Sequence, residues 1–95
     1  MLLIAPTESR FNLGSSYATA NAIATFTREQ LAECFRRHAK ADWGDLEPSD
    51  AAENDLALES EGRLFSKYEF PDGKKLWVIT EADRSATTAL LPGDY

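Results

Sequence analysis

Residues 62–91 constrain the fold of this chain more than any other stretch. They contain three apolar-rich runs, and two polar breaks rich in turn-forming residues separate these runs. Side chains in the first two runs divide into two alternating sets, as in β-strands, and both sets contain aromatic and aliphatic residues. Asp72-Gly73, in the first break, is a strong hairpin signal. The stretch therefore predicts a three-stranded antiparallel meander with both faces partly covered.

A helix is expected before the meander, over residues 27–41. Thr27 stands three residues before Gln30, and this spacing allows the two residues to cap the helix start reciprocally. Inside the helix, the less polar positions recur at the spacing of one helical face: Leu31, Cys34, Phe35, His38 and Ala39. The pattern predicts one helix with a single covered face.

A second helix is expected over about residues 48–60. Pro48 suits a first helical position, where its missing N–H costs no hydrogen bond, and Gly62 is a natural stop signal. The apolar residues of this segment are few, namely Ala52 and Leu56, with Leu58 as an addition. We expect one narrow apolar stripe to hold such a helix, while the rest of its surface faces water.

The chain of 95 residues suits one domain, because two domains of half that length would each be too small to bury a core. A strand-like centre at residues 16–19 precedes the first helix. Residues 1–12 carry little pattern and predict a weakly ordered extension. We therefore predict a single α+β domain over residues 13–95. Its small antiparallel sheet would contain the C-terminal meander and the N-terminal strand, with two helices packed on one face.

Charge is distributed unevenly along the chain, whose formal net charge is −6. Residues 1–41 carry a net charge of about +2, and residues 62–95 are neutral. All of the excess lies in residues 42–61, which we call the acidic segment, and this segment has no basic residue. Its carboxylates are those of Asp42, Asp45, Glu47, Asp50, Glu53, Asp55, Glu59 and Glu61. The segment predicts a negative face, which is either a docking surface for a basic partner or a solvated helix surface.

Several function classes are disfavoured by composition. The negative net charge argues against direct binding to nucleic acid, which needs a basic surface. No apolar run approaches the roughly 18 residues of a membrane span, and the first residues lack the basic start of a signal peptide. The one cysteine, Cys34, cannot form an internal disulfide, and its spacing fits the covered side of a helix. These features predict a cytoplasmic protein.

Catalytic and metal-binding signatures are weak in the sequence. His38 and Asp42 are four residues apart and, with Asp45, can reach one metal ion if the helix continues that far. No second histidine and no cysteine pair supports such a site. The alternative is a helix-end histidine whose ring covers apolar surface and bonds a nearby acid or carbonyl. The sequence also lacks a Gly-rich phosphate loop, so we predict no enzyme, no metal and no cofactor.

The loop formed by Asp42, Trp43, Gly44 and Asp45 allows two interpretations. In the first, it connects two helices: Trp43 packs, Gly44 takes a positive φ angle, and Asp45 caps the next turn. In the second, it is an exposed recognition loop that Trp43 anchors to a partner, since loops on a rigid scaffold often carry binding residues.

Glu81, Asp83 and Arg84 share the second break of the meander. Two neighbouring carboxylates can perform general acid–base chemistry, and with His38 these residues make up a candidate polar site. The alternative is that Arg84 is the salt-bridge or hydrogen-bond partner of the two carboxylates in a tight polar turn.

Two further motifs are distinctive: the first contains Arg37-His38 and Asp42-Trp43-Gly44-Asp45-Leu46, and the second spans residues 77–88 and continues to Leu90-Leu91-Pro92. Together they resemble a family of short proteins carried on bacterial plasmids and other mobile elements. Family members are usually called plasmid-related or hypothetical proteins, and some are labelled restriction–modification subunits without an evident methyltransferase motif. The resemblance covers roughly residues 13–95. Where family members have a Pro-Gly-type turn after the first strand, this chain has Ala20-Asn21.

Small size, the acidic segment and this resemblance favour a non-enzymatic protein-interaction module from a mobile genetic element. Its expected role is to inhibit a host defence complex, such as a CRISPR effector or a restriction enzyme, by docking on a basic nucleic-acid-binding protein. The expected partner-binding residues are Asp42, Trp43, Asp45, Glu47, Asp50, Glu53 and Asp55. The alternative is an accessory or regulatory protein of nucleic-acid metabolism, either a small restriction–modification subunit or a DNA-binding regulator. A two-fold homodimer through a sheet edge or an uncovered sheet face is also expected.

Overall fold

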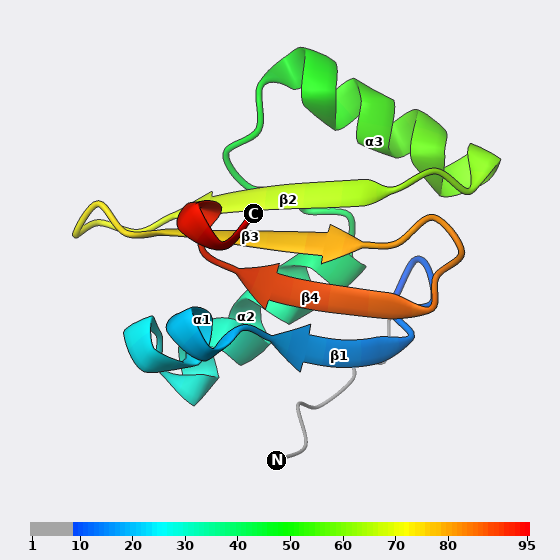
Figure 1. Cartoon of the computed structure of the whole chain (residues 1–95). Helices are drawn as coiled ribbons and strands as arrows, with labels where there is room; N and C mark the ends of the chain where they lie inside the picture. The colour runs from blue at the N-terminus through cyan, green and yellow to red at the C-terminus, as the bar shows by residue number, and fades with distance from the viewer. Residues whose placement is uncertain (1–8) are drawn as a thin grey trace.

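The computed structural model describes residues 9–95, which form four strands, three α-helices and a short 3-10 helix (Figure 1). In chain order the elements are β1 (Ser15–Ala18), α1 (Ala20–Thr25), α2 (Arg28–Ala39), α3 (Pro48–Ser60), β2 (Leu64–Glu69), β3 (Lys75–Thr80), β4 (Ala86–Leu90) and η1 (Pro92–Asp94). The predicted α+β class is confirmed, and the helices pack against the sheet. Within these residues, every helix is too short or too polar to cross a membrane.

The strands of the predicted meander are neighbours in the sheet, and both of their pairings are antiparallel. The sheet order is β1-β4-β3-β2, so β1 and β2 are the two outer strands. β1 pairs with β4 in parallel, with Ser15 opposite Ala86 and Ala18 opposite Ala89. The sheet is therefore mixed rather than wholly antiparallel. No hairpin joins β1 to β4, so no turn forces their directions to be opposite.

α2 covers one face of the sheet and supplies three of the nine residues of the buried core cluster. Thr27 Oγ1 accepts a hydrogen bond from the Gln30 N–H, and Gln30 Oε1 accepts one from the Thr27 N–H, so the predicted capping box is present. The buried residues of α2 are those of the predicted face: Leu31, Cys34, Phe35, His38 and Ala39. From the sheet, Tyr68, Leu76 and Val78 join the same core cluster. The expected covered face of this helix is confirmed.

α3 has the predicted bounds, but different contacts hold it. It lies along the outer side of β2 (Figure 1), and Asn54 is its buried residue. Ala52 is exposed and Leu56 is 68% exposed, so the predicted apolar stripe is wrong. Polar contacts attach the helix instead, and a hydrophobicity pattern does not detect these. The left-handed residue that ends α3 is Glu61, with φ of 59°, rather than the expected Gly62.

The outer edge of β2 is closed by groups that do not belong to a strand. The Asn54 side-chain amide donates to the Phe65 carbonyl (2.6 Å) and accepts from the Phe65 N–H (3.2 Å). Two residues further along, the Lys67 N–H donates to the Trp43 carbonyl, and the Lys67 carbonyl accepts from the Asp45 N–H. Because these outward-facing backbone groups already have hydrogen-bond partners, they cannot pair with a further β-strand.

Replacement of Asn54 by aspartate is expected to loosen α3. The carboxylate can still accept from the Phe65 N–H, but it cannot donate to the Phe65 carbonyl and leaves that oxygen unpaired, at a cost of about 1–3 kcal/mol. Amide protons of α3 should then exchange with solvent faster, while those of α2 keep their rates, as measured by NMR. Asp55→Asn is the matched control, because its amide oxygen still accepts from Trp43 Nε1. Equal α3 exchange rates in both variants would contradict the assigned role of Asn54.

The start of the described chain belongs to the packed domain. The Arg10 N–H donates to a carbonyl at the end of α2 (2.8 Å), and the Phe11 ring stacks on Trp43 with centroids 6.2 Å apart. Arg10 and Phe11, which the sequence assigned to the N-terminal extension, therefore contact the domain. Residues 1–8 lie outside the described residues.

Candidate interaction surface

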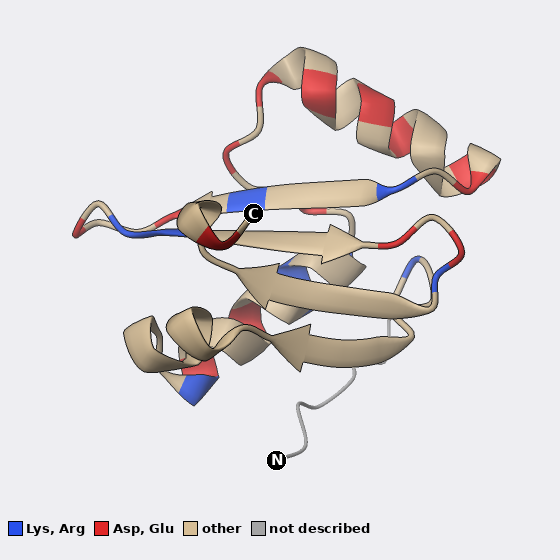
Figure 2. Ribbon diagram, viewed as in Figure 1, with Lys and Arg blue, Asp and Glu red and all other residues tan. Residues whose placement is uncertain are grey.

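Acidic residues recur along α3, as the red bands of the ribbon in Figure 2 show, and they are exposed to solvent. We define the acidic face as the exposed acidic residues of α3 and its two ends, namely Glu47, Asp50, Glu53, Asp55, Glu59 and Glu61. The ion pairs among the described residues all lie elsewhere, so no described cation pairs with these carboxylates. A surface with this much uncompensated negative charge attracts basic groups and repels nucleic acid.

Leu56 stands among the carboxylates of the acidic face and is 68% exposed. It follows Glu53 by three residues and precedes Glu59 by three, so the three side chains share one side of the helix. An exposed leucine at the centre of a charged surface provides the apolar contact that a protein interface needs inside its polar rim. The outward side of α3 therefore combines charge with one apolar group.

Three carboxylates of the acidic segment have structural partners: Asp55, which accepts from Trp43 Nε1, and also Asp42 and Asp45. Asp42 Oδ2 accepts a hydrogen bond from Arg37 Nε (2.7 Å), and this bond lowers the pKa of the Asp42 carboxyl below its ordinary value. Asp45 Oδ2 accepts from the Glu69 N–H (2.8 Å), which helps to close the β2 edge. Asp45 was expected to cap the next helical turn, and this is wrong, because its carboxylate caps a strand instead. Asp42 and Asp45 are less available to a partner than the acidic face.

Trp43 is not an exposed anchor. Its side chain is 6% exposed, and its Nε1 donates to Asp55 Oδ1 (3.0 Å). The ring covers His38, with centroids 5.5 Å apart, and Gly44 takes a positive φ of 75°. The loop therefore connects two helices, and the exposed recognition loop is wrong, because burial of the large indole ring stabilises the domain. Of the predicted partner-binding residues, the acidic face retains Glu47, Asp50, Glu53 and Asp55.

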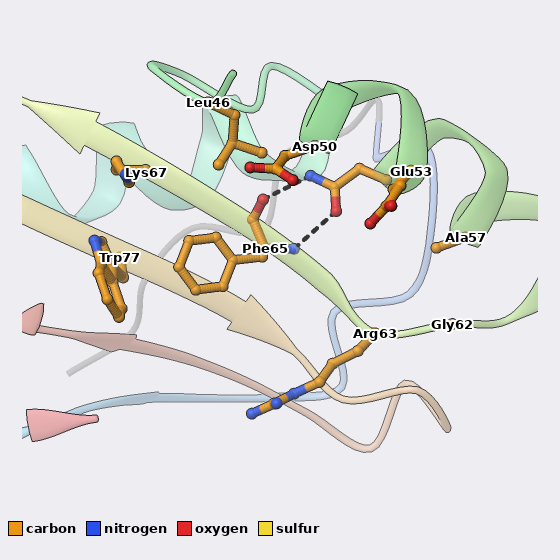
Figure 3. Close-up of a pocket in the computed structure, with 10 residues that line it drawn as sticks. Leu46, Asp50, Glu53, Ala57, Gly62, Arg63, Phe65, Lys67 and Trp77 are labelled. Atoms are coloured by element: carbon orange, nitrogen blue, oxygen red, sulfur yellow. Dashed lines mark hydrogen bonds between the residues drawn. The ribbon is translucent and has the colours of Figure 1, made fainter. Parts of the chain in front are cut away.

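A groove of about 530 Å³ lies between α3 and the sheet face that α2 does not cover (Figure 3). The rings of Phe65 and Trp77, with centroids 5.0 Å apart, provide aromatic surface on the sheet side. Asp50 and Glu53 line the groove from α3, and Lys67 lines it from β2. Trp77 Nε1 is buried and has no acceptor among residues 9–95. The groove therefore places an apolar floor directly beside the acidic face.

His38 is fully buried between α2 and the sheet, in a chain of hydrogen bonds. Its Nδ1 is 2.5 Å from Ser66 Oγ, and its Nε2 is 2.9 Å from Thr80 Oγ1. Thr80 Oγ1 is 2.7 Å from Thr87 Oγ1, and the Thr87 hydroxyl donates to the Leu13 carbonyl. A carbonyl can only accept, so Thr80 must donate to Thr87, and His38 must donate from Nε2 to Thr80. The neutral ring then accepts from Ser66 at Nδ1.

The surroundings of His38 do not form the metal site considered from the sequence. Burial, with a smaller contribution from Arg84, lowers the pKa of His38 to about 3. Both ring nitrogens are bonded to hydroxyl groups, rather than to the acid or carbonyl expected, and Asp42 is bonded to Arg37. Within residues 9–95, no group of three or more His, Cys, Asp or Glu side chains is placed to hold a metal ion.

Glu81, Asp83 and Arg84 do not assemble with His38 into one polar site. The Arg84 guanidinium donates to the carbonyl oxygens of Ala57, Gly62, Glu81 and Ala82. It thereby ties the turn to the last part of α3, where a cation suits the unpaired carbonyls. The exposed Asp83 accepts from Ser85, and this lowers the pKa of the Asp83 carboxyl. The expectation that Arg84 pairs with the two carboxylates is therefore wrong.

Two sets of residues in these sites were missed from the sequence. The first lines the groove or holds α3: Asn54, Arg63, Phe65, Lys67 and Trp77. The second bonds to His38 or extends that chain: Ser66, Thr80 and Thr87. The sequence did contain features that could have indicated both sets of residues. Aromatic residues occurred on both faces of the meander, and hydroxyl residues occupied strand positions on the same face as large apolar ones.

Comparisons with family models, curated proteins and solved structures find no match for this chain. Its function must therefore be inferred from its own surfaces.

Proposed function

We propose that this chain is a non-enzymatic protein-interaction module that binds a basic partner through the acidic face of α3. The observation that carries the proposal is a row of exposed carboxylates on one helix with no described cation paired to them. Glu59 lies in the last turn of α3, where a negative charge is unfavourable beside the helix C-terminus and weakens the helix. A charge arrangement that costs stability favours a role outside folding.

The groove beside the acidic face supplies a second contact for the same partner. A segment whose basic side chains reach Asp50 and Glu53 can place a neighbouring apolar side chain against Phe65 and Trp77. Electrostatic attraction then guides the encounter, and apolar burial slows dissociation. The partner segment that fits this surface has basic residues next to an aromatic or aliphatic one.

The proposed partner is a nucleic-acid-binding protein of a host defence complex, such as a CRISPR effector or a restriction enzyme. Such proteins carry basic grooves for phosphate groups, and an array of carboxylates can occupy these grooves competitively. The resemblance of two sequence motifs to proteins carried on plasmids supports an origin in a mobile genetic element. On this proposal the chain acts in the cytoplasm as an inhibitor.

A role in binding DNA directly has less support. Its contact would be the basic residues around α2, namely Arg28, Arg36, Arg37 and Lys40. Arg36 is paired with Glu33, and Arg37 is paired with Asp42. The Arg37 guanidinium also lies over the Tyr68 ring, 4.6 Å from its centroid. Two of the four cations are therefore engaged within the domain, which leaves few charges for phosphate binding.

Reversal of charge on the acidic face is expected to abolish partner binding. The test variant carries Asp50→Lys, Glu53→Lys and Glu59→Lys, and it spares Asp55 because that carboxylate holds Trp43. Tagged protein is used to capture partners from the native host, and mass spectrometry quantifies the basic nucleic-acid-binding proteins retained at low and high salt. We expect the variant to retain at least about tenfold less of them, because several charge pairs are lost at once.

A matched control variant distinguishes the loss of charges on the acidic face from the change in the net charge of the whole chain. It carries Glu29→Lys, Glu69→Lys and Glu81→Lys on other exposed positions, and each set of three reversals brings the formal net charge from −6 to zero. The control should retain the same partners as the unmodified chain. Equal loss in both variants, or unchanged capture by the acidic-face variant, would contradict the proposal. The inhibitory role also predicts that the unmodified chain, but not the acidic-face variant, raises transformation of a restricting host.

A further inference from the structure

The two outer strands of the sheet differ in how their edges are treated. The edge of β2 is closed, whereas no residue from 9 to 95 pairs with the outer edge of β1. The N–H groups of Ser15 and Thr19 donate to carbonyls of the β4 segment. Backbone groups alternate in direction along a strand, so the N–H and C=O groups of Ser16 and Ala18 point away from β4. Among residues 9–95, no backbone or side-chain group forms a hydrogen bond across this outer edge.

The segment that contains β1 has no charged residue of its own, and the nearest carboxylate beyond its end is Asp94, which accepts hydrogen bonds from Thr19 and Asn21. No charged residue stands between Arg10 and Arg28, although 27% of the chain is charged. Within this stretch Tyr17, in the middle of β1, is 56% exposed, and Ile23 of α1 is 61% exposed. Depletion of charge together with exposed aromatic and aliphatic groups is the composition of an interface core. The edge lacks the lysine or proline that usually protects an outer strand from pairing.

We propose that β1 pairs with β1 of a second copy of this chain, across a two-fold axis, to form one continuous sheet. The strand itself has no charged residue, so two copies with a net charge of −6 repel each other less at this edge than at their acidic faces. The acidic face lies beside β2, at the opposite edge of the sheet (Figure 2), so the pairing separates the two acidic faces. Each copy therefore keeps its acidic face open.

Two-fold symmetry and the outward backbone groups define the register. Ser16 pairs with the second copy's Ala18, and Ala18 pairs with the second copy's Ser16, through hydrogen bonds in both directions. Tyr17 then lies opposite the second copy's Tyr17 as a non-hydrogen-bonded pair, with Cα atoms about 4.5 Å apart. Aromatic side chains in such cross-strand pairs stabilise a sheet. In this register the exposed Tyr17 ring packs against the Tyr17 ring of the second copy.

Cysteine cross-linking tests the register. In Tyr17→Cys the two thiols lie opposite each other, within the Cα separation of about 4.4–6.8 Å that a disulfide needs. Ser15→Cys is the matched control, because it lies on the same strand and face, yet its two copies are roughly 13 Å apart in this register. Cys34 is buried, and burial raises its pKa to about 11, so it does not compete. We expect about tenfold more oxidised dimer from Tyr17→Cys than from Ser15→Cys.

Sedimentation equilibrium tests the dimer itself. The unmodified chain should have a dimer's mass at sub-millimolar concentration. Ser16→Pro removes an outward N–H without touching the pairing with β4, so it should be a monomer, whereas Ser16→Thr keeps the N–H and should stay dimeric. The acidic-face variant should remain a dimer, so failure of the proposed partner binding leaves this test unaffected. A monomeric unmodified chain, or equal cross-linking of the two cysteine variants, would overturn the proposal.

Discussion

Replacement of His38 by alanine is expected to lower the free energy of unfolding by about 3–5 kcal/mol. The ring fills space between α2 and the sheet, so its removal leaves a cavity in the core. It also leaves the hydroxyl groups of Ser66 and Thr80 without their imidazole partner in a buried site. Unpaired polar groups in such a site carry a desolvation cost in addition to the lost packing. Chemical denaturation at pH 7 measures the effect.

The pH dependence of stability provides the control for His38. Its pKa is about 3 in the folded protein and has the ordinary value of 6.5 in the unfolded chain. At pH 7 both states are largely neutral, and below pH 6.5 the unfolded chain binds a proton that the folded protein does not. Stability should therefore fall by about 2 kcal/mol from pH 7 to pH 5, and further towards pH 3. The chain has one histidine, so His38→Ala should lose this fall between pH 7 and pH 5.

A flat stability profile of the unmodified chain between pH 7 and pH 5 would contradict the buried neutral ring. Below about pH 5 the carboxylates begin to titrate as well, so the comparison is restricted to the upper part of the range. The ordered donors around the ring explain why protonation is unfavourable there. A second proton at Nδ1 would face Ser66, whose own hydroxyl proton already occupies that bond.

Gly44→Ala is expected to destabilise the domain by about 4 kcal/mol or more. Gly44 has a φ of 75°, which is strained for alanine. A Cβ atom there would overlap the Lys67 carbonyl oxygen and lie 2.6 Å from the Tyr68 ring. Neither neighbour can yield easily, because the Lys67 backbone is hydrogen-bonded to this loop and Tyr68 is in the core. Thermal and chemical denaturation both report the loss.

Gly73→Ala separates backbone strain from overlap. Gly73 also has a positive φ, at 88°, but a Cβ there would meet no heavy atom within 4 Å. Its replacement should cost only about 1–2 kcal/mol, the penalty of a left-handed conformation for an ordinary residue. Similar losses in the two variants would show that φ alone matters, and would contradict the close packing of the loop against β2.

Elements with local signals were predictable from the sequence. Thr27 and Gln30 mark the start of α2 by their own hydrogen bonds, and Pro48 marks the start of α3 by its missing N–H. The packing of α3 was not predictable, because it depends on a side-chain amide, that of Asn54, bonding to the backbone of Phe65. A polar contact of this kind produces no periodic pattern of apolar residues in the sequence.

The candidate site was predictable in composition but not in geometry. The excess of acid in residues 42–61 is visible in the sequence, and most of it does lie exposed on α3. Which carboxylates are engaged depends on tertiary contacts, such as the bond from Arg37 to Asp42. Trp43 could equally have been a surface anchor or a core residue, because only the fold shows that it covers His38. The groove needs two segments to meet, so neither one predicts it.

Closure of the β2 edge also sets a limit on assembly. Growth of a fibre by strand addition requires every molecule to offer two compatible free edges, so that each new subunit presents a site for the next. Here Asn54 and the loop around Gly44 occupy one of the two edges, so within the described sheet β1 is the one edge left for strand addition. Any sheet that this chain builds with itself must therefore terminate after two subunits, which protects a chain with an unguarded strand from open-ended aggregation.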